Sequence, residues 1–287
     1  MRELAEASSF DRELRVAVEL AREAGAVILD LYDGLIEVEQ KNDRNLLEPV
    51  TLADRRANEL IVDAIQRQFP DDGILAEESV DTDRRLGKRR VWMVDPLDGT
   101  TGFIDGNGDF AVQIGLAEDG AAVVGVVYQP YTDLLYRAVR GNGAWIERPG
   151  EEPKRAHVSQ QHELPLMILA ASRSHRSPRM DRVVKAFGVK QEVRRGSVGI
   201  KVGLITEQQC DLYVHLSPHT KQWDTCAPQV ILNEAGGRLT DLYGSPISYN
   251  APDVQHHNGL VATNGAVHAT VIEALAPLLA EFGRVPV

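Results

Sequence analysis

The middle of the chain most constrains the fold, because it consists of short apolar segments separated by turn residues. From Phe110 to Ala138 the sequence is apolar and β-branched, with breaks at Asp119-Gly120 and at Pro130. Runs of this kind between turn residues predict an antiparallel meander of strands. Gly141-Asn142-Gly143 predicts one more hairpin turn, before a strand over residues 144–146. The fold must therefore contain a sheet whose strands follow one another in the sequence.

Two amphipathic helices are expected before this sheet. Leu14–Leu31 has apolar residues at helical spacing and is followed by Gly34, and Leu52–Phe69 ends at the turn Pro70-Asp71-Asp72-Gly73. Short strands are expected over residues 36–40, 74–76 and 91–94.

After the meander the pattern changes to alternating strands and helices. Residues 147–164 contain Pro149, Gly150 and Pro153 among several charges, and we interpret them as a linker. Beyond them we expect strands over 167–171 and 212–216 and helices over 180–187, 199–207, 225–235 and 267–282. The expected fold class is α/β, as a layered α+β sandwich with an N-terminal half over residues 1–155 and a C-terminal half over 156–287.

Composition narrows the function. The 287 residues are 43% hydrophobic and carry a net charge of −11, which is typical of a globular enzyme and argues against binding to a nucleic acid polymer. No apolar run is long enough to span a bilayer, and residues 1–15 mix charged and apolar side chains, unlike a signal peptide. Cys210 and Cys226 form no CxxC pair, so we expect a reducing compartment and a cytoplasmic protein without a membrane partner.

The segment Asp95-Pro96-Leu97-Asp98-Gly99-Thr100-Thr101, directly after the expected strand Val91–Val94, carries the most chemistry. Two carboxylates three residues apart, with the Leu97 carbonyl between them, can hold hard cations. Gly99 lets the backbone approach a ligand, and the Gly99 and Thr100 amides would point at a phosphate if they open a helix. The alternative is a plain Asp-Pro turn. Because an acidic protein needs local positive charge to bind phosphate, divalent metal ions are the simplest addition.

Further carboxylates stand near the ends of expected elements. Glu77-Glu78 follows the strand over 74–76, Asp54 begins the helix Leu52–Phe69, and Asp224 follows Trp223 at the start of a helix. Each has an ordinary explanation: Glu77-Glu78 as solvated surface, Asp224 as a helix cap. Asp105-Gly106-Asn107-Gly108-Asp109 begins like a calcium loop, but Phe110 stands where Gly is required, so we interpret it as a turn.

Taken together, Glu77, the segment Asp95–Thr100 and Trp223-Asp224 resemble the signature elements of the inositol monophosphatase superfamily. The resemblance runs from Leu14 to Phe282. It implies the αβαβα arrangement of the inositol monophosphatase and fructose-1,6-bisphosphatase type, and a lithium-sensitive phosphatase that uses two or three Mg²⁺ ions per site. The metal ligands that it implies are Glu77, Asp95, the Leu97 carbonyl, Asp98 and Asp224. The catalytic residues that it implies are Asp54, Thr100 and Glu77, with Asp54 and Thr100 orienting or deprotonating the attacking water.

Within the superfamily the chain is more similar to the 3′(2′),5′-bisphosphate nucleotidase branch, which acts in sulfur metabolism. The similar segments are Lys221–Pro228, Gly236–Asp241, Ser172–His175, and Gly196-Ser197 followed by Lys201. The substrate-binding residues implied by both resemblances are Asp98, Gly99, Thr100, Ser172, His175, Ser197, Lys201 and Asp224. One feature departs: Thr100-Thr101-Gly102-Phe103 resembles the inositol-phosphate branch, because nucleotidases often carry Lys after the Thr.

Three hypotheses follow. The first is a nucleotidase converting adenosine 3′,5′-bisphosphate to AMP and phosphate; the second is an inositol-monophosphate or sugar-phosphate phosphatase on the same scaffold. The third, a catalytically silent nucleotide or metal sensor, does not need the intact carboxylate set. The first two hypotheses differ in whether His175 and Lys201 face the metals. Without the resemblance, the ordinary explanation would be that His175 is a loop residue and Lys201 a solvated helix residue. The expected partner is a small phosphorylated metabolite, first a nucleotide bisphosphate, with a homodimer as a further possibility.

Overall fold

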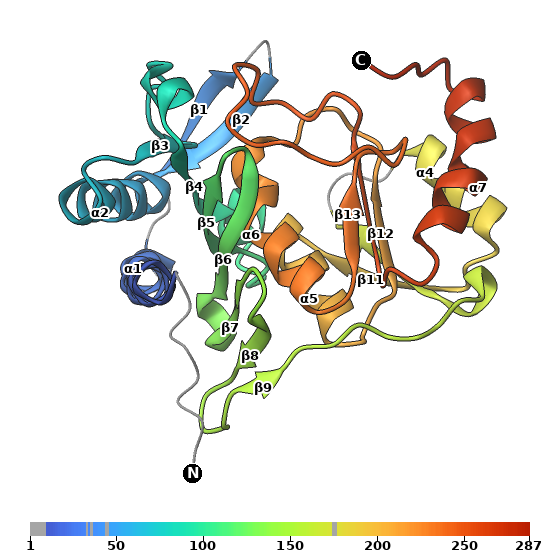
Figure 1. Ribbon diagram of the computed structural model, residues 1–287, viewed down its shortest axis with the longest axis horizontal. Helices are drawn as coiled ribbons and strands as arrows, with labels where there is room; N and C mark the ends of the chain where they lie inside the picture. The colour runs from blue at the N-terminus through green and yellow to red at the C-terminus, as the bar shows by residue number, and fades with distance from the viewer. Residues whose placement is uncertain (1–9, 33, 35–36, 44–45, 174–176) are drawn as a thin grey trace.

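The computed structural model describes residues 10–32, 34, 37–43, 46–173 and 177–287, which fold into alternating layers of helices and sheets (Figure 1). Two helices cover the outer face of a seven-stranded sheet, two lie between this sheet and a five-stranded one, and two cover the far face of the second sheet. In that order the helices are α1 (Asp11–Tyr32) and α2 (Leu52–Gln68), α5 (Val198–Thr206) and α6 (Gln222–Glu234), and α4 (Pro178–Phe187) and α7 (His268–Glu281). The predicted αβαβα sandwich is thus confirmed.

The seven-stranded sheet has its strands in sequence order, and all neighbours except β3 and β4 are antiparallel. Its strands are β3 (Gly73–Ala76), β4 (Arg90–Asp98), β5 (Ala111–Glu118), β6 (Ala121–Gln129), β7 (Leu134–Val139), β8 (Gly143–Glu147) and β9 (Lys154–Arg155). The meander prediction is confirmed. The linker prediction over 147–164 is wrong at β9, because Lys154 and Arg155 pair with β8.

The five-stranded sheet has the order β11-β10-β12-β14-β13, with parallel pairing around β10 and antiparallel pairing around β14. Its strands are β10 (Ile168–Ser172), β11 (Gln191–Arg195), β12 (Leu212–His215), β13 (Arg238–Thr240) and β14 (Leu260–Thr263). Only β10 and β12 were predicted. A separate hairpin of β1 (Val38–Asp43) and β2 (Leu46–Thr51) precedes α2. The strand expected over 36–40 matches β1 in part, since Ile36 lies outside the described residues.

Shorter helical segments and one shifted boundary complete the course of the chain. The short helices are α3 (Thr100–Ile104), η1 (Arg84–Gly87), η2 (Pro130–Thr132) and η3 (Leu164–Leu166). Helix α6 begins at Gln222, three residues before the predicted start, so Trp223 and Asp224 lie in its first turn. No helix in the described part of the chain is both long and apolar enough to cross a bilayer. The division into halves at residue 155 stays a prediction.

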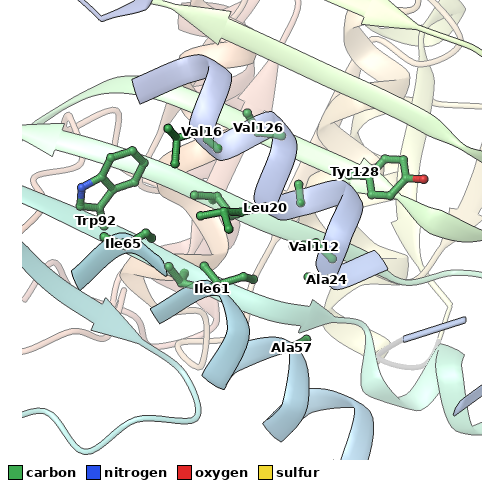
Figure 2. Close-up of a cluster of buried hydrophobic side chains, with 14 of the residues drawn as sticks. Val16, Leu20, Ala24, Ala57, Ile61, Ile65, Trp92, Val112, Val126 and Tyr128 are labelled. Carbon is green, nitrogen blue, oxygen red and sulfur yellow. The ribbon is translucent and has the colours of Figure 1, made fainter. Parts of the chain in front are cut away.

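Helices α1 and α2 pack on the seven-stranded sheet through residues four apart, which lie on one face of a helix (Figure 2). Leu20 of α1 and Ile61 of α2 are almost completely buried against Trp92 of β4 and its neighbours. Burial of one such aliphatic side chain contributes about 1.5–3 kcal/mol. This layer fixes β4, which carries the central carboxylates described below.

On the other face of the same sheet, α6 lies directly against two glycines. Gly115 of β5 and Gly125 of β6 are opposite each other in the strand pair. A Cβ added at Gly125 would be 2.4 Å from the Ala227 carbonyl oxygen, and one at Gly115 would be 2.8 Å from Cys226 Sγ. The missing side chains thus let the α6 backbone touch the sheet, and Asp224 stands in the first turn of this closely seated helix.

Candidate active site

The acidic segment lies at an irregular end of β4. The sequence predicted that this segment follows the strand, but Asp95–Asp98 are part of β4 itself. The pairing of β4 with β5 shifts within this segment, with Asp95 opposite Gln113 and Asp98 opposite Ala111. A shift of three residues along β4 thus faces a shift of two residues along β5, as in a β-bulge, which changes the direction of side chains. Asp95 is buried, and its Oδ1 accepts the Leu97 amide hydrogen at 3.0 Å.

Gly99 makes the turn that follows. Its φ is +99°, and a Cβ there would lie 2.5 Å from the Asp109 carbonyl oxygen, so an L side chain is excluded both by conformation and by space. Thr100 then begins α3, as the sequence suggested.

Asp54 and Thr100 come together from separate elements. Asp54 stands in the first turn of α2, where its Oδ2 accepts hydrogen bonds from the Thr51 amide at 2.8 Å and the Thr51 hydroxyl at 2.6 Å. Its other oxygen, Oδ1, accepts the Thr100 hydroxyl at 3.1 Å. Burial, together with the charge of Glu77, raises the pKa of Asp54 although these donors oppose the shift. The pair therefore forms a proton-accepting carboxylate in contact with a hydroxyl.

Asp98 joins β4 to the first turn of α5. Its Oδ2 accepts hydrogen bonds from Gln113 Nε2 at 2.5 Å, Ser197 Oγ at 2.6 Å and the Gly199 amide at 3.1 Å. Ser197 also caps α5, where its Oγ accepts the Ile200 amide at 3.1 Å, and it does so at a φ of +43°. A non-glycine residue in this region is strained and persists where its surroundings require it.

Asp224 is not the N-cap of α6, which is Lys221, but as the third helical residue it takes part in the capping. Its Oδ2 accepts the Lys221 amide hydrogen at 2.7 Å at the start of α6. It also lines the same cleft as Glu77, Asp98 and Thr100. Capping and a place in the cleft are compatible, because a carboxylate has two oxygens with several acceptor positions.

Glu77 has a partner that sequence reasoning missed. Lys41 of β1 donates from Nζ to Glu77 Oε1 at 2.8 Å and also to Glu78. Burial opposes protonation, but the charges of both glutamates raise the pKa of Lys41 above its ordinary value. Nothing in the local pattern around Lys41 indicated this contact, because the partners are 36 and 37 residues away.

The carboxylates act on one another electrostatically. Burial raises the pKa values of Asp95 and Asp224 well above the ordinary range, and the charges of Glu77 and Asp98 add to both shifts. Burial also raises the pKa of Asp98. Among the described residues, however, no three His, Cys, Asp or Glu side chains converge as a metal-binding group. The predicted ligands thus share one region without forming a finished coordination shell, and their hard oxygen donors suit Mg²⁺ in chemical type.

The cleft has a volume of about 410 Å³ and a second side of different character. We call Asp54, Glu77, Asp95, Asp98 and Asp224 the carboxylate side, and Ser172, Gly196, Ser197 and Lys201 the lysine side. All of them except Asp54 and Asp95 line the cleft, while His175 lies outside the described residues.

Lys201 is buried, with 4% exposure, which rules out a solvated helix residue. Its Nζ donates to the Gly196 carbonyl at 3.2 Å and lies 5.0 Å from the centre of the Tyr213 ring. Burial lowers the pKa of Lys201 to about 8, against the opposing charges of Asp98, Asp109 and Asp224. The lysine side thus carries a desolvated cation next to the carboxylates.

The structure is a layered α/β sandwich in which Glu77, Asp98 and Asp224 line one cleft, and the match to a family of phosphatases identifies its class. Residues 10–279 match the model of the inositol monophosphatase family, and the chain belongs to this family. Its enzymes are metal-dependent.

Relatives from two branches are similar to the chain. The 3′(2′),5′-bisphosphate nucleotidase CysQ of Escherichia coli K12 is 37% identical over 80% of this chain and 91% of its own length. The inositol-1-monophosphatase of Bacillus subtilis is 31% identical over 90% and 94%, respectively. Among solved structures, CysQ from Bacteroides thetaiotaomicron matches with a TM-score of 0.74 and 31% identity over 89% of this chain and 98% of its own. The Thermotoga maritima IMPase matches with a TM-score of 0.79 and 25% identity, over 95% and 100%.

Proposed function

We propose that the protein is a magnesium-dependent 3′(2′),5′-bisphosphate nucleotidase that converts adenosine 3′,5′-bisphosphate to AMP and phosphate. The observation that carries the proposal is the buried ammonium group of Lys201 in the cleft that the carboxylates line. A single phosphate at the carboxylate side would not need this cation, whereas a second phosphate would. The similarity to nucleotidases, up to 37% identity for the relatives compared, supports the same substrate.

In this proposal the Mg²⁺ ions are bound by Glu77, Asp95, Asp98, Asp224 and the Leu97 carbonyl. When bound, they supply positive charge to the phosphate and lower the pKa of a water molecule. They would also relieve the repulsion that raises the pKa values of Asp95 and Asp224. Glu77 would exchange its ion pair with Lys41 for the metal, since its Oε1 is the atom that Lys41 contacts.

Asp54 and Thr100 handle the proton of the attacking water. The Thr100 hydroxyl donates to Asp54 Oδ1, which leaves the Thr100 oxygen able to accept a hydrogen bond from water. The water is thereby oriented for in-line attack on phosphorus, and its proton passes toward Asp54. As the new P–O bond forms, the P–O bond to the ribose 3′-oxygen breaks, and this oxygen leaves and takes up a proton from solvent. The raised pKa of Asp54 favours its acceptance of the proton.

An inositol-monophosphate or sugar-phosphate phosphatase is the second candidate. It is favoured by the run Thr100-Thr101-Gly102-Phe103, which lacks the Lys common in nucleotidases, and by the similarity to the inositol-1-monophosphatase of Bacillus subtilis. A silent binding protein is disfavoured because the full carboxylate set is retained.

Phosphate release from a panel of substrates with Mg²⁺ tests the proposal. We expect adenosine 3′,5′-bisphosphate to have the highest kcat/KM, ahead of 3′-AMP and inositol 1-phosphate. A preference for inositol phosphate would support the second candidate instead. If no phosphate is released from any substrate, the silent binding protein is favoured.

The variant Lys201→Met tests the carrying observation with little change in side-chain volume. A charge-assisted hydrogen bond to phosphate contributes about 1.5–3 kcal/mol, so kcat/KM for adenosine 3′,5′-bisphosphate should fall about tenfold to a hundredfold. The value for inositol 1-phosphate should hardly change. Equal losses on both substrates would contradict a role of Lys201 in binding a second phosphate.

A further inference from the structure

Asp109 lies behind the cleft, in the loop between α3 (Thr100–Ile104) and β5, within the segment that we interpreted as a simple turn. The turn is confirmed, but Asp109 has only 4% exposure, and it does not line the cleft. A buried carboxylate is costly unless charges or hydrogen bonds compensate it. Its contacts therefore indicate what it does.

The Asp109 carboxylate is bound to the lysine side. Its Oδ2 accepts the Gly196 amide hydrogen at 2.9 Å and Arg173 Nε at 2.7 Å. Gly196 precedes the capping residue Ser197, and Arg173 follows Ser172. Arg195 is more distant, with Nε 3.7 Å from Asp109 Oδ1. Hydrogen bonds that involve a charged partner are about twice as strong as neutral ones, so this carboxylate holds both segments firmly.

The Asp109 carbonyl is packed against the turns on both sides of the cleft. A Cβ at Gly99 or at Gly102 would be 2.5 Å from this oxygen, and a Cβ at Gly196 would be 2.6 Å from it. Contact this close is possible because all three residues are glycines. One residue thus touches the turn before Thr100 with its backbone and the turn before Ser197 with both its backbone and its side chain.

We propose that Asp109 is a positioning residue that fixes the separation between the Gly99–Thr100 turn and the Gly196–Ser197 turn, and thereby selects substrates that contact both. The inference rests on the proposed function in one respect: the preferred substrate carries a second group that reaches the lysine side. Asp109 does not line the cleft, although it lines a neighbouring cavity together with Arg173 and Arg195, so in this inference it acts through other residues. Its effect is transmitted through Gly196 to Ser197 and Lys201, since Lys201 Nζ donates to the Gly196 carbonyl.

The test compares three purified full-length variants with Mg²⁺ present. Asp109→Asn keeps the shape of the side chain but removes its charge. Arg173→Met removes the partner at 2.7 Å and Arg195→Met the one at 3.7 Å, and these two arginines have similar side-chain exposures of 44% and 39%. The readout is kcat/KM for the substrate that the wild type prefers, divided by kcat/KM for p-nitrophenyl phosphate, which has no second phosphate. Loss of folded protein cancels in this ratio.

We expect the ratio to fall about tenfold in Asp109→Asn and about threefold in Arg173→Met, mainly through KM, with little change in Arg195→Met, because small displacements at a binding site have large effects. An unchanged ratio in both Asp109→Asn and Arg173→Met would overturn the inference. Equal losses in Arg173→Met and Arg195→Met would also overturn it, because they would indicate a general charge effect. If the wild type prefers another substrate, only the nucleotidase assignment fails. The inference on Asp109 is then tested with that preferred substrate in the ratio.

Discussion

Three of the five carboxylates on the carboxylate side have a hydrogen bond to a near neighbour in the sequence, whereas Gly196 and Ser197 on the lysine side are held by residues far along the chain. Asp54 binds Thr51, Asp95 binds Leu97 and Asp224 binds Lys221, all two or three residues away. Ser197 instead binds Asp98, 99 residues away, and Gly196 binds Asp109, 87 residues away.

The difference shows that the two sides depend on the fold in different ways. A local hydrogen bond forms whenever its helix or strand end forms, so Asp54, Asp95 and Asp224 keep these bonds as long as α2, β4 and α6 exist. Asp98 and Glu77 are exceptions on this side, because they bind Ser197 and Lys41. A long-range contact exists only when two layers are docked correctly. Changes at Asp54, Asp95 or Asp224 should therefore affect the chemical step and spare the fold, and changes at Gly196 or Ser197 should affect substrate binding together with stability.

The largest effect is expected from removal of a proposed metal ligand. Asp95→Asn should lower kcat by about a thousandfold or more, as loss of strong electrostatic stabilisation does, and EDTA treatment of the wild type should do the same. The free energy of unfolding should not fall, because Asn removes a charge that burial disfavours. Turnover and thermal unfolding of the same samples test this; near-normal turnover in either sample would contradict a metal mechanism.

Thr100→Ala should lower kcat about a hundredfold and change KM less than twofold, because its hydroxyl acts on the attacking water mainly in the transition state. Steady-state kinetics separates the two parameters. If KM rises while kcat stays, Thr100 binds substrate, and the assignment of this residue to the chemical step is wrong.

Ser197→Ala should combine a loss of stability with a loss of activity. Removal of an N-cap costs about 1 kcal/mol, and Asp98 also loses a hydrogen bond at 2.6 Å, so we expect kcat/KM to fall about tenfold. Ser177→Ala is the matched control, because Ser177 caps α4 with a 3.2 Å bond to the Met180 amide and lies outside the cleft. Urea unfolding should show a larger loss of stability in Ser197→Ala, which loses two hydrogen bonds, than in Ser177→Ala, which loses one. Full activity in Ser197→Ala would disprove the coupling.

The smallest effect on activity is expected outside the cleft, where only stability should change. His268 is buried between the Thr240 and Thr263 hydroxyls, and burial lowers its pKa to about 4. The unfolded chain then binds a proton more tightly than the folded one, so stability is lost as pH falls below 6.5, by about 2 kcal/mol between pH 7 and pH 5. His268→Gln should flatten this slope, and the exposed His162→Gln should not. If the free energy of unfolding depends on pH equally in the wild type and both variants, His268 does not contribute to the loss of stability in acid.

Local patterns made α1, α2, the meander and most C-terminal helices predictable. Strand β11 was missed because it is largely polar and charged, and β13 because it has only three residues, so that no alternation was visible. Strand β14 was missed although it is as short and as apolar as the predicted β12. For the same reason the carboxylate side could be read from residues near strand and helix ends. The roles of Lys41 and Asp109 could not, because their partners lie at least 36 residues away.

Gly115 and Gly125, which lie against α6, determine the distance between this helix and the seven-stranded sheet. Neither glycine lines the cleft. Asp224 belongs to α6, whereas Asp95 and Asp98 belong to β4, a strand of the sheet that α6 contacts. In the proposed metal site, the gap between helix and sheet sets how far apart these carboxylates stand and thus which ionic radius they would accommodate. One methyl group at Gly125, which would meet the backbone of Ala227, would widen that gap and move the preference from a small cation such as Mg²⁺ toward larger ones.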